Sequence, residues 1–111
     1  MALVFFRSKA AAEIIMLGDT ARRLLESMGR CDAQGQAPER GVLRGPAVAE
    51  AIAALEAAVA LEDAREGPRD PFADEGVPAH RRPVRLAQRA FPLLAMLRAA
   101  QARGADVTWE P

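Results

Sequence analysis

The chain has 111 residues, half of them hydrophobic, and its 15 basic and 15 acidic residues cancel to a formal net charge of zero at pH 7. This length suits a single domain. The charge balance excludes the strong positive field that general binding to nucleic acids or anionic membranes requires. No apolar segment approaches the ~20 residues needed to span a bilayer, so no membrane is expected as a partner.

Cysteine usage and the N-terminal residues predict the compartment. Cys31 is the single cysteine, which excludes a disulfide within one chain and suits a reducing environment. The apolar N-terminal run ends at Arg7 and lacks the basic leader and the longer hydrophobic stretch of a secretion signal. We therefore expect a soluble, cytoplasmic protein. Its one Trp and four Phe predict a thin core that association supplements.

The N-terminal block predicts a strand that leads into a helix. Residues 3–6 are apolar and partly aromatic, as in a strand. After Ser8, whose hydroxyl suits a helix N-cap, apolar residues recur every three or four positions and predict an amphipathic helix that stops at Gly29. These residues are Ile14, Leu17, Ala21, Leu24 and Met28. Gly18 falls inside this helix, so either a neighbouring element packs closely over it or the helix bends.

The middle of the chain predicts a connector and a second helix. Residues 30–45 are rich in Gly, Gln, Arg and Pro, and within them Val42 and Leu43 suit a very short strand. Pro46 then occupies a favourable first helical position. The apolar stripe of this helix consists of Val48, Ile52, Leu55 and Val59. Its many alanines permit close approach of another helix, either from a partner or from the internal core.

The last part of the chain completes the expected fold. Prolines and charged residues at about 63–83 predict a mobile spacer. A third helix over 86–103 stops at Gly104, and Pro92 within it is expected to kink the helix or to split it. The Val107-Thr108-Trp109 tail predicts a strand. The order strand, helix, helix, helix, strand predicts an α+β fold, one domain over residues 1–111, in which the terminal strands pair and the helices pack on one face.

Several stretches of the sequence match a known family. Near the N-terminus they are Arg7-Ser8-Lys9-Ala10-Ala11, Ile15-Met16-Leu17-Gly18-Asp19, Arg23-Leu24-Leu25 and Met28-Gly29. Further along they are Ala51-Ile52-Ala53-Ala54-Leu55, Val84, Leu86, Gln88-Arg89-Ala90-Phe91-Pro92-Leu93, Met96-Leu97, Val107 and Trp109. In these stretches the chain resembles the domain of unknown function 1840 family, a group of small bacterial proteins. Arg7 replaces an expected Lys and Phe91 an expected Trp. The resemblance implies little about function, because the family is itself uncharacterised.

The chain offers few residues for catalysis or metal binding. His80 is the single histidine, and nothing near it in the spacer would orient it for catalysis. One His and one Cys cannot form the usual zinc site within one chain. Cys31 follows the end of the first helix, where the helix dipole opposes a thiolate and Arg30 favours one, so we interpret it as a plain thiol. We expect neither an enzyme nor a cofactor or metal.

The charged residues leave two interpretations open. Asp19 is the best single carboxylate candidate, and we favour an exposed pair with Arg22 or Arg23. An arginine cluster marks the start of the third helix, consisting of Arg81, Arg82, Arg85 and Arg89. It would bind phosphate or nucleic acid if free, and we favour its pairing with the acidic side chains of the spacer. Those side chains are Asp70, Asp74 and Glu75.

Two functions follow from these observations. The leading hypothesis is a non-enzymatic protein–protein interaction or adaptor module with an unknown protein partner. We expect it to be a homodimer, because a two-stranded sheet is marginal alone and its open edge recruits another strand. Trp109 should be at least partly buried in that arrangement. The alternative is a small protein that binds an anion, phosphate or nucleic acid, although nucleic acid is not the expected partner. Its binding residues would be Arg22, Arg23, Arg85 and Arg89.

Overall fold

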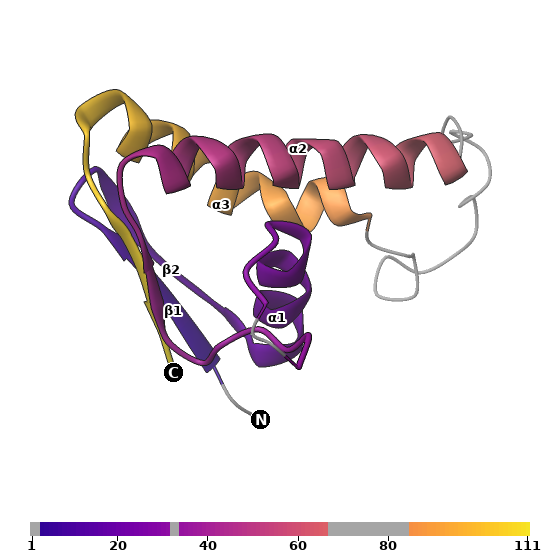
Figure 1. Cartoon of the computed structure of the whole chain (residues 1–111), viewed down its shortest axis with the longest axis horizontal. Coiled ribbons are helices and arrows are strands. Elements are labelled where there is room, and N and C mark those ends of the chain that lie inside the picture. The colour runs from indigo at the N-terminus through magenta and orange to yellow at the C-terminus, as the bar shows by residue number, and fades with distance from the viewer. Residues whose placement is uncertain (1–2, 32–33, 67–84) are drawn as a thin grey trace, which may run out of the picture.

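The structure is a computed structural model that describes residues 3–31, 34–66 and 85–111. Its elements are, in chain order, β1 (Leu3–Ser8), β2 (Ala11–Leu17), α1 (Gly18–Ser27), β3 (Gly41–Leu43), α2 (Pro46–Glu66), α3 (Leu86–Arg103) and β4 (Val107–Glu110). Four strands of this part form one antiparallel sheet in the order β2-β1-β4-β3. Helices and sheet occupy separate layers (Figure 1). The α+β class is therefore confirmed.

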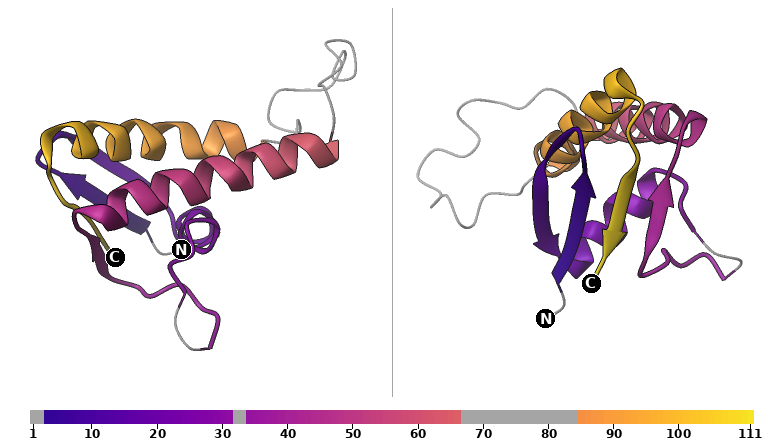
Figure 2. Two further views of the ribbon diagram at one scale, coloured as in Figure 1. Left: turned by 45° about the horizontal axis from the view of Figure 1, so that its top comes forward. Right: turned by 90° about the vertical axis from the view of Figure 1, so that its left-hand side faces the viewer.

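The two ends of the chain meet in the centre of the sheet. β1 pairs with β4, and Phe6 lies opposite Trp109, which confirms that the terminal strands pair. β3 pairs with the other side of β4, and Val42 lies opposite Thr108. The very short strand expected at this place is therefore also confirmed. Figure 2 shows β1 and β4 between the two edge strands.

The three helices lie on one side of the sheet, as predicted (Figure 1). α2 and α3 pack side by side, and α3 also packs on β2 and β1. Because side chains alternate along a strand, every second strand residue points toward these helices. The buried residues of the sheet are Phe6, Leu43, Val107 and Trp109. They form one core with apolar residues of the three helices.

The predicted first helix is wrong in its first part, where the chain forms a β-hairpin. A tight turn at Lys9 and Ala10 leads into β2, whose Ile14 lies opposite Phe6. Two-residue hairpin turns usually contain Asn-Gly or a similar pair with positive φ. This turn has no glycine, and a register shift beyond Phe6 supplies a bulge that adjusts the twist instead. The sequence therefore carries no clear turn signal here, and its alanines favour a helix instead.

Ser8 and Gly18 consequently have other roles than those predicted. The Ser8 hydroxyl accepts a hydrogen bond from the Ala10 N–H at 3.2 Å, inside the hairpin turn rather than at a helix N-terminus. Gly18 is the first residue of α1 and follows β2 directly, so it requires neither a close neighbour nor a bend. The helix ends just before Gly29, as predicted, where φ is 77°, a conformation that favours glycine.

The second and third helices start and stop close to the predicted residues. α2 begins at Pro46 and continues to Glu66, so residues 63–66 belong to the helix rather than to the spacer. α3 ends before Gly104, as predicted, and it is continuous through Pro92. The alternative in which the proline splits this helix is therefore wrong.

Part of the sequence-based prediction concerns residues 67–84, which lie outside the described residues. It comprises the remaining spacer and its proposed mobility. It also comprises the interpretations given to Asp70, Asp74, Glu75, His80, Arg81 and Arg82. These interpretations stay predictions.

Trp109 lies in the core of a single chain. Its indole N–H donates a hydrogen bond to the carbonyl of Pro38 at 3.0 Å, and the residue is 3% exposed. The ring covers Gly41 on the neighbouring strand, where any Cβ atom would overlap it. The burial of Trp109 is thus confirmed. It needs no second copy, however, so it says nothing about association.

Candidate functional site

The outer face of the sheet, opposite the helices, carries exposed apolar side chains. Leu3 lies opposite Leu17, and Phe5 lies opposite Ile15. Paired residues share a face, and the neighbouring Phe6 is fully buried on the inner face, so these four side chains point outward. Leu3, Ile15 and Leu17 are 44%, 55% and 46% exposed. We call the four residues the outer apolar patch.

Nothing in the described part of the chain packs on this face. The right-hand view of Figure 2 looks onto it, and no described helix crosses in front of the strands. A contiguous apolar patch on an open face is typical of interaction sites, whereas single exposed apolar residues are common everywhere. The outer apolar patch is therefore the leading candidate for a binding surface.

A charged cluster borders the outer apolar patch. Arg7 on β1 forms ion pairs with Glu13 on β2 and with Glu110 on β4. Its guanidinium carbon lies 5.3 Å from the centre of the Phe5 ring, within the range of a cation–π contact. The hydrogen bond to Glu13 raises the pKa of the Arg7 guanidinium, which is charged at physiological pH in any case. One positive and two negative groups leave this cluster with one net negative charge.

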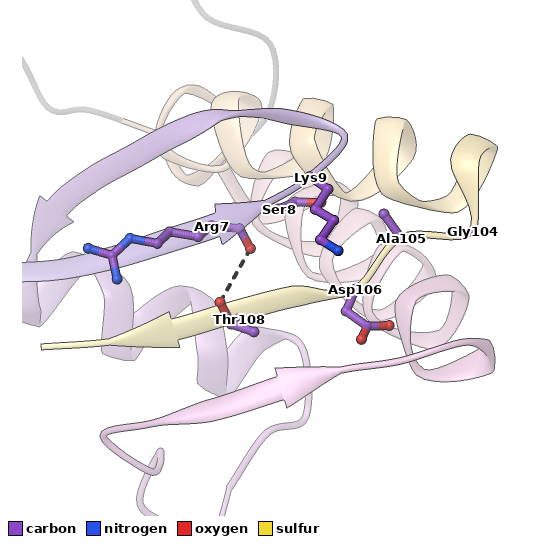
Figure 3. A pocket seen from close by; sticks show the side chains of 7 residues that line it. All are labelled: Arg7, Ser8, Lys9, Gly104, Ala105, Asp106 and Thr108. Carbon is purple, nitrogen blue, oxygen red and sulfur yellow. Dashed lines mark hydrogen bonds between the residues drawn. The ribbon is translucent and has the colours of Figure 1, made fainter.

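A shallow, open depression of about 560 Å³ lies between the β1–β2 turn and the loop from α3 to β4. Figure 3 shows that Lys9 extends from the turn toward this loop, whereas the Arg7 side chain points away from it. The Thr108 hydroxyl donates to the Arg7 carbonyl at 3.4 Å. The Asp106 carboxylate lies 3.5 Å from Arg44. These contacts hold polar groups at the margin of the depression and build no enclosed site around Lys9.

Arg23, one of the predicted anion-binding residues, lies where the three helices meet. It donates a hydrogen bond to one carboxylate oxygen of Glu62 at 2.7 Å. The other Glu62 oxygen accepts the backbone N–H of Leu86 at 2.9 Å, in the first turn of α3, where a negative charge is favourable. Glu62 thus links α1, α2 and α3, and Arg23 is part of this structural junction.

Arg85 and Arg89 reach the same corner of the molecule. Arg85 lies 3.5 Å from the Asp63 carboxylate, and Arg89 donates to the Thr20 hydroxyl at 3.2 Å. The structure therefore brings Arg85 and Arg89 close to the junction at Glu62. Each of these two arginines has an acceptor within the described part of the chain.

The remaining predicted residues lie elsewhere on the surface. Arg22 pairs with Asp19 at 3.2 Å within α1, which confirms the exposed intrahelical pair favoured for Asp19. Arg22 thus pairs within its own helix, whereas Arg23 pairs with Glu62 on α2. Cys31 is an exposed free thiol, and its interpretation as a plain thiol stays a prediction.

Other kinds of site are not found among the residues that the structure describes. No three His, Cys, Asp or Glu side chains of this part are placed to hold a metal ion. None of its helices is long and apolar enough to cross a membrane. None of its polar or charged side chains is buried, so its charged groups all lie at the surface.

These observations define a small α+β protein with a four-stranded antiparallel sheet, helices on one face and apolar side chains on the other. The chain belongs to the family described as a domain of unknown function, DUF1840, which it matches over residues 2–109. The resemblance found in the sequence is therefore confirmed. Comparison with curated proteins gives no match, and neither does comparison with solved structures.

Sequence reasoning misses the outer apolar patch because it places residues 11–17 in a helix. A signal for the correct structure does exist in the uninterrupted run Ile14-Ile15-Met16-Leu17. Such a run suits a strand that is apolar on both faces as well as part of a helix. The two isoleucines favour the strand.

Proposed function

We propose that the protein is a non-enzymatic interaction module that binds another protein through the outer apolar patch and works as a homodimer. The observation that carries this proposal is the contiguous exposure of Leu3, Ile15 and Leu17 on an open sheet face. Large apolar side chains are scarce in this chain. Because these three are about half exposed, each forgoes part of the ~1.5–3 kcal/mol that full burial of such a side chain contributes. A partner that covers them recovers this free energy.

The charges beside the patch indicate the chemistry of the partner. The cluster of Arg7, Glu13 and Glu110 has one net negative charge. Complementarity then favours a partner segment that presents apolar residues flanked by a basic side chain. An amphipathic helix laid across an apolar surface meets this description.

Site-specific cross-linking tests the proposal. A photoreactive amino acid replaces Leu3 in the patch, and the control position is Ala57, which is exposed on α2. We expect position 3 to capture a defined protein in cells and position 57 to capture none. The captured segment, made as a peptide, should then bind the purified chain, and Leu3→Lys should weaken this binding at least tenfold. Equal capture at both positions, or a peptide indifferent to Leu3→Lys, would contradict the proposed function.

Anion binding by Arg22, Arg23, Arg85 and Arg89 is the alternative proposal. Its support is that Arg23, Arg85 and Arg89 gather near one corner of the molecule. The acceptors Glu62, Asp63 and Thr20 at the same corner compete with any anion. Retention on heparin at low salt distinguishes the two proposals, because salt-dependent retention supports anion binding and flow-through supports the interaction module.

A further inference from the structure

The two edge strands of the sheet differ in how well they are protected against pairing with another strand. β3 has three residues and is flanked by Arg40 and Arg44. β2 has seven residues and contains neither lysine nor proline. Natural sheets protect their edges by short strands, charged residues, prolines and bulges. β3 therefore carries two of these features, whereas most of β2 carries none.

A bulge determines which part of β2 is available to another strand. Between the Phe6–Ile14 pair and the Ser8–Ala11 pair, β2 uses one more residue than β1. The extra residue therefore falls at positions 12–13, near the turn. From Ile14 to Leu17 the pairing with β1 is regular. Within the described residues no strand pairs with the other edge of this stretch.

We propose that the free edge of β2 pairs antiparallel with β2 of a second copy, about a two-fold axis at Ile15. This inference rests on the homodimer in the proposed function and specifies its interface. An axis perpendicular to the sheet keeps both outer faces on one side. Since directly opposite residues share a face, this axis must lie midway between the two copies of one residue, which then face each other. Ile15 then lies opposite its own copy, Ile14 opposite Met16, and Glu13 opposite Leu17.

Charge and the bulge favour this register over those centred on Glu13 and Ile14. A pairing centred on Glu13 would put two carboxylates directly opposite each other, which is unfavourable. A pairing centred on Ile14 would draw the bulged residues into the ladder and bring the two Glu13 side chains into diagonal contact. Centred on Ile15, the three middle pairs are apolar, and each Glu13 stays at the end beside its own Arg7.

The proposed pairing also enlarges the binding surface. The outer apolar patch lies on β1 and β2, so two copies joined at β2 place their patches next to each other on one continuous sheet. A partner segment would then contact both copies at once. The homodimer and the interaction module therefore depend on the same strand.

Disulfide cross-linking tests the register. In a Cys31→Ser background, Ile15→Cys places two thiols on directly opposite residues, whose Cα atoms are about 4.5–5.5 Å apart in an antiparallel pair, within disulfide reach. Leu17→Cys is the control on the same strand, because in this register its two copies are about 14 Å apart. We expect a disulfide-linked dimer for Ile15→Cys and none for Leu17→Cys. Equal linkage of both, or none at position 15 in a dimeric sample, would overturn the register.

Charge substitutions, measured by sedimentation at micromolar concentration, separate this inference from the proposed function. Ile15→Lys should weaken self-association at least tenfold, whereas Leu3→Lys, on an internal strand, should leave it unchanged. A dimer indifferent to Ile15→Lys would reject pairing through β2, and a wild-type monomer would reject the homodimer altogether. In either case the cross-linking at position 3 still decides whether the patch binds a partner protein.

Discussion

The inner and outer faces of the sheet are made by alternate residues of the same strands, and their exposure differs sharply. On the inner face Phe6 and Val107 are fully buried. On the outer face Leu3 and Ile15 are about half exposed, although they are equally apolar. The difference arises because all three helices pack on the inner face. Hydrophobic side chains thus occur on both faces, but the described part of the chain covers one of them.

The comparison shows what an uninterrupted apolar strand means in a small protein. A strand with one wet face normally alternates apolar and polar residues, and a continuous apolar run indicates burial on both faces. β1 and β2 contain the runs Leu3–Phe6 and Ile14–Leu17. Their pattern is that of strands covered on two sides, and this is the physical reason to expect another protein on the outer face.

The largest effect is expected on the inner face. Phe6→Ala should destabilise the fold by about 3–5 kcal/mol, because it removes a fully buried ring and leaves a cavity. The matched control is Phe91→Ala on α3, where the ring is 71% exposed and the change should be within about 0.5 kcal/mol. Urea unfolding measures both. Similar losses for the two variants would show that the inner face is not the core.

A smaller effect is expected where Trp109 packs on Gly41. Gly41→Ala should cost about 1–3 kcal/mol, because its Cβ would overlap the indole ring and force it to move. The emission of Trp109, the single tryptophan, should change with it. Val42→Ala is the control, because the Val42 side chain points to the other face of the same strand. It should leave the emission of Trp109 unchanged. An unaltered spectrum and stability in Gly41→Ala would refute the close packing of these two residues.

The smallest effect on folding is expected on the outer face. Leu3→Ser should change the free energy of unfolding by about 0.5 kcal/mol or less, since about half of its side chain is already exposed to water in the single chain. The comparison is made in an Ile15→Lys background, so that association does not contribute. A loss of several kcal/mol would mean that Leu3 is covered within the chain, and the difference between the two faces would disappear.

The helix ends and the terminal strands are predictable from local chemistry. Pro46 marks the start of α2, and Gly29 and Gly104 follow the ends of α1 and α3, because each of these residues has a strong backbone preference. The pairing of β1 with β4 is predictable because both terminal segments are apolar strands, and each requires a hydrogen-bonded neighbour in a sheet. These features depend on few residues and little tertiary context.

The hairpin and the outer apolar patch are not predictable in the same way. The hairpin turn at Lys9 and Ala10 lacks the glycine that is typical of two-residue hairpin turns. Ile14 and Leu17 also fit a helical stripe, so only pairing with β1 decides between helix and strand. The acceptors of Arg23 and Arg89 likewise come from distant parts of the chain, and no sequence pattern connects them.

Hydrogen exchange of the full chain, measured at low and high protein concentration, tests most directly that β2 is the edge at which this protein associates. The alternate amides of residues 13–17 that β1 leaves unpaired should become protected as the concentration rises. The amides of Gly41–Leu43 on the opposite edge should exchange at the same rate throughout. Concentration-independent exchange along β2, or protection that appears on β3 instead, would contradict association through the β2 edge.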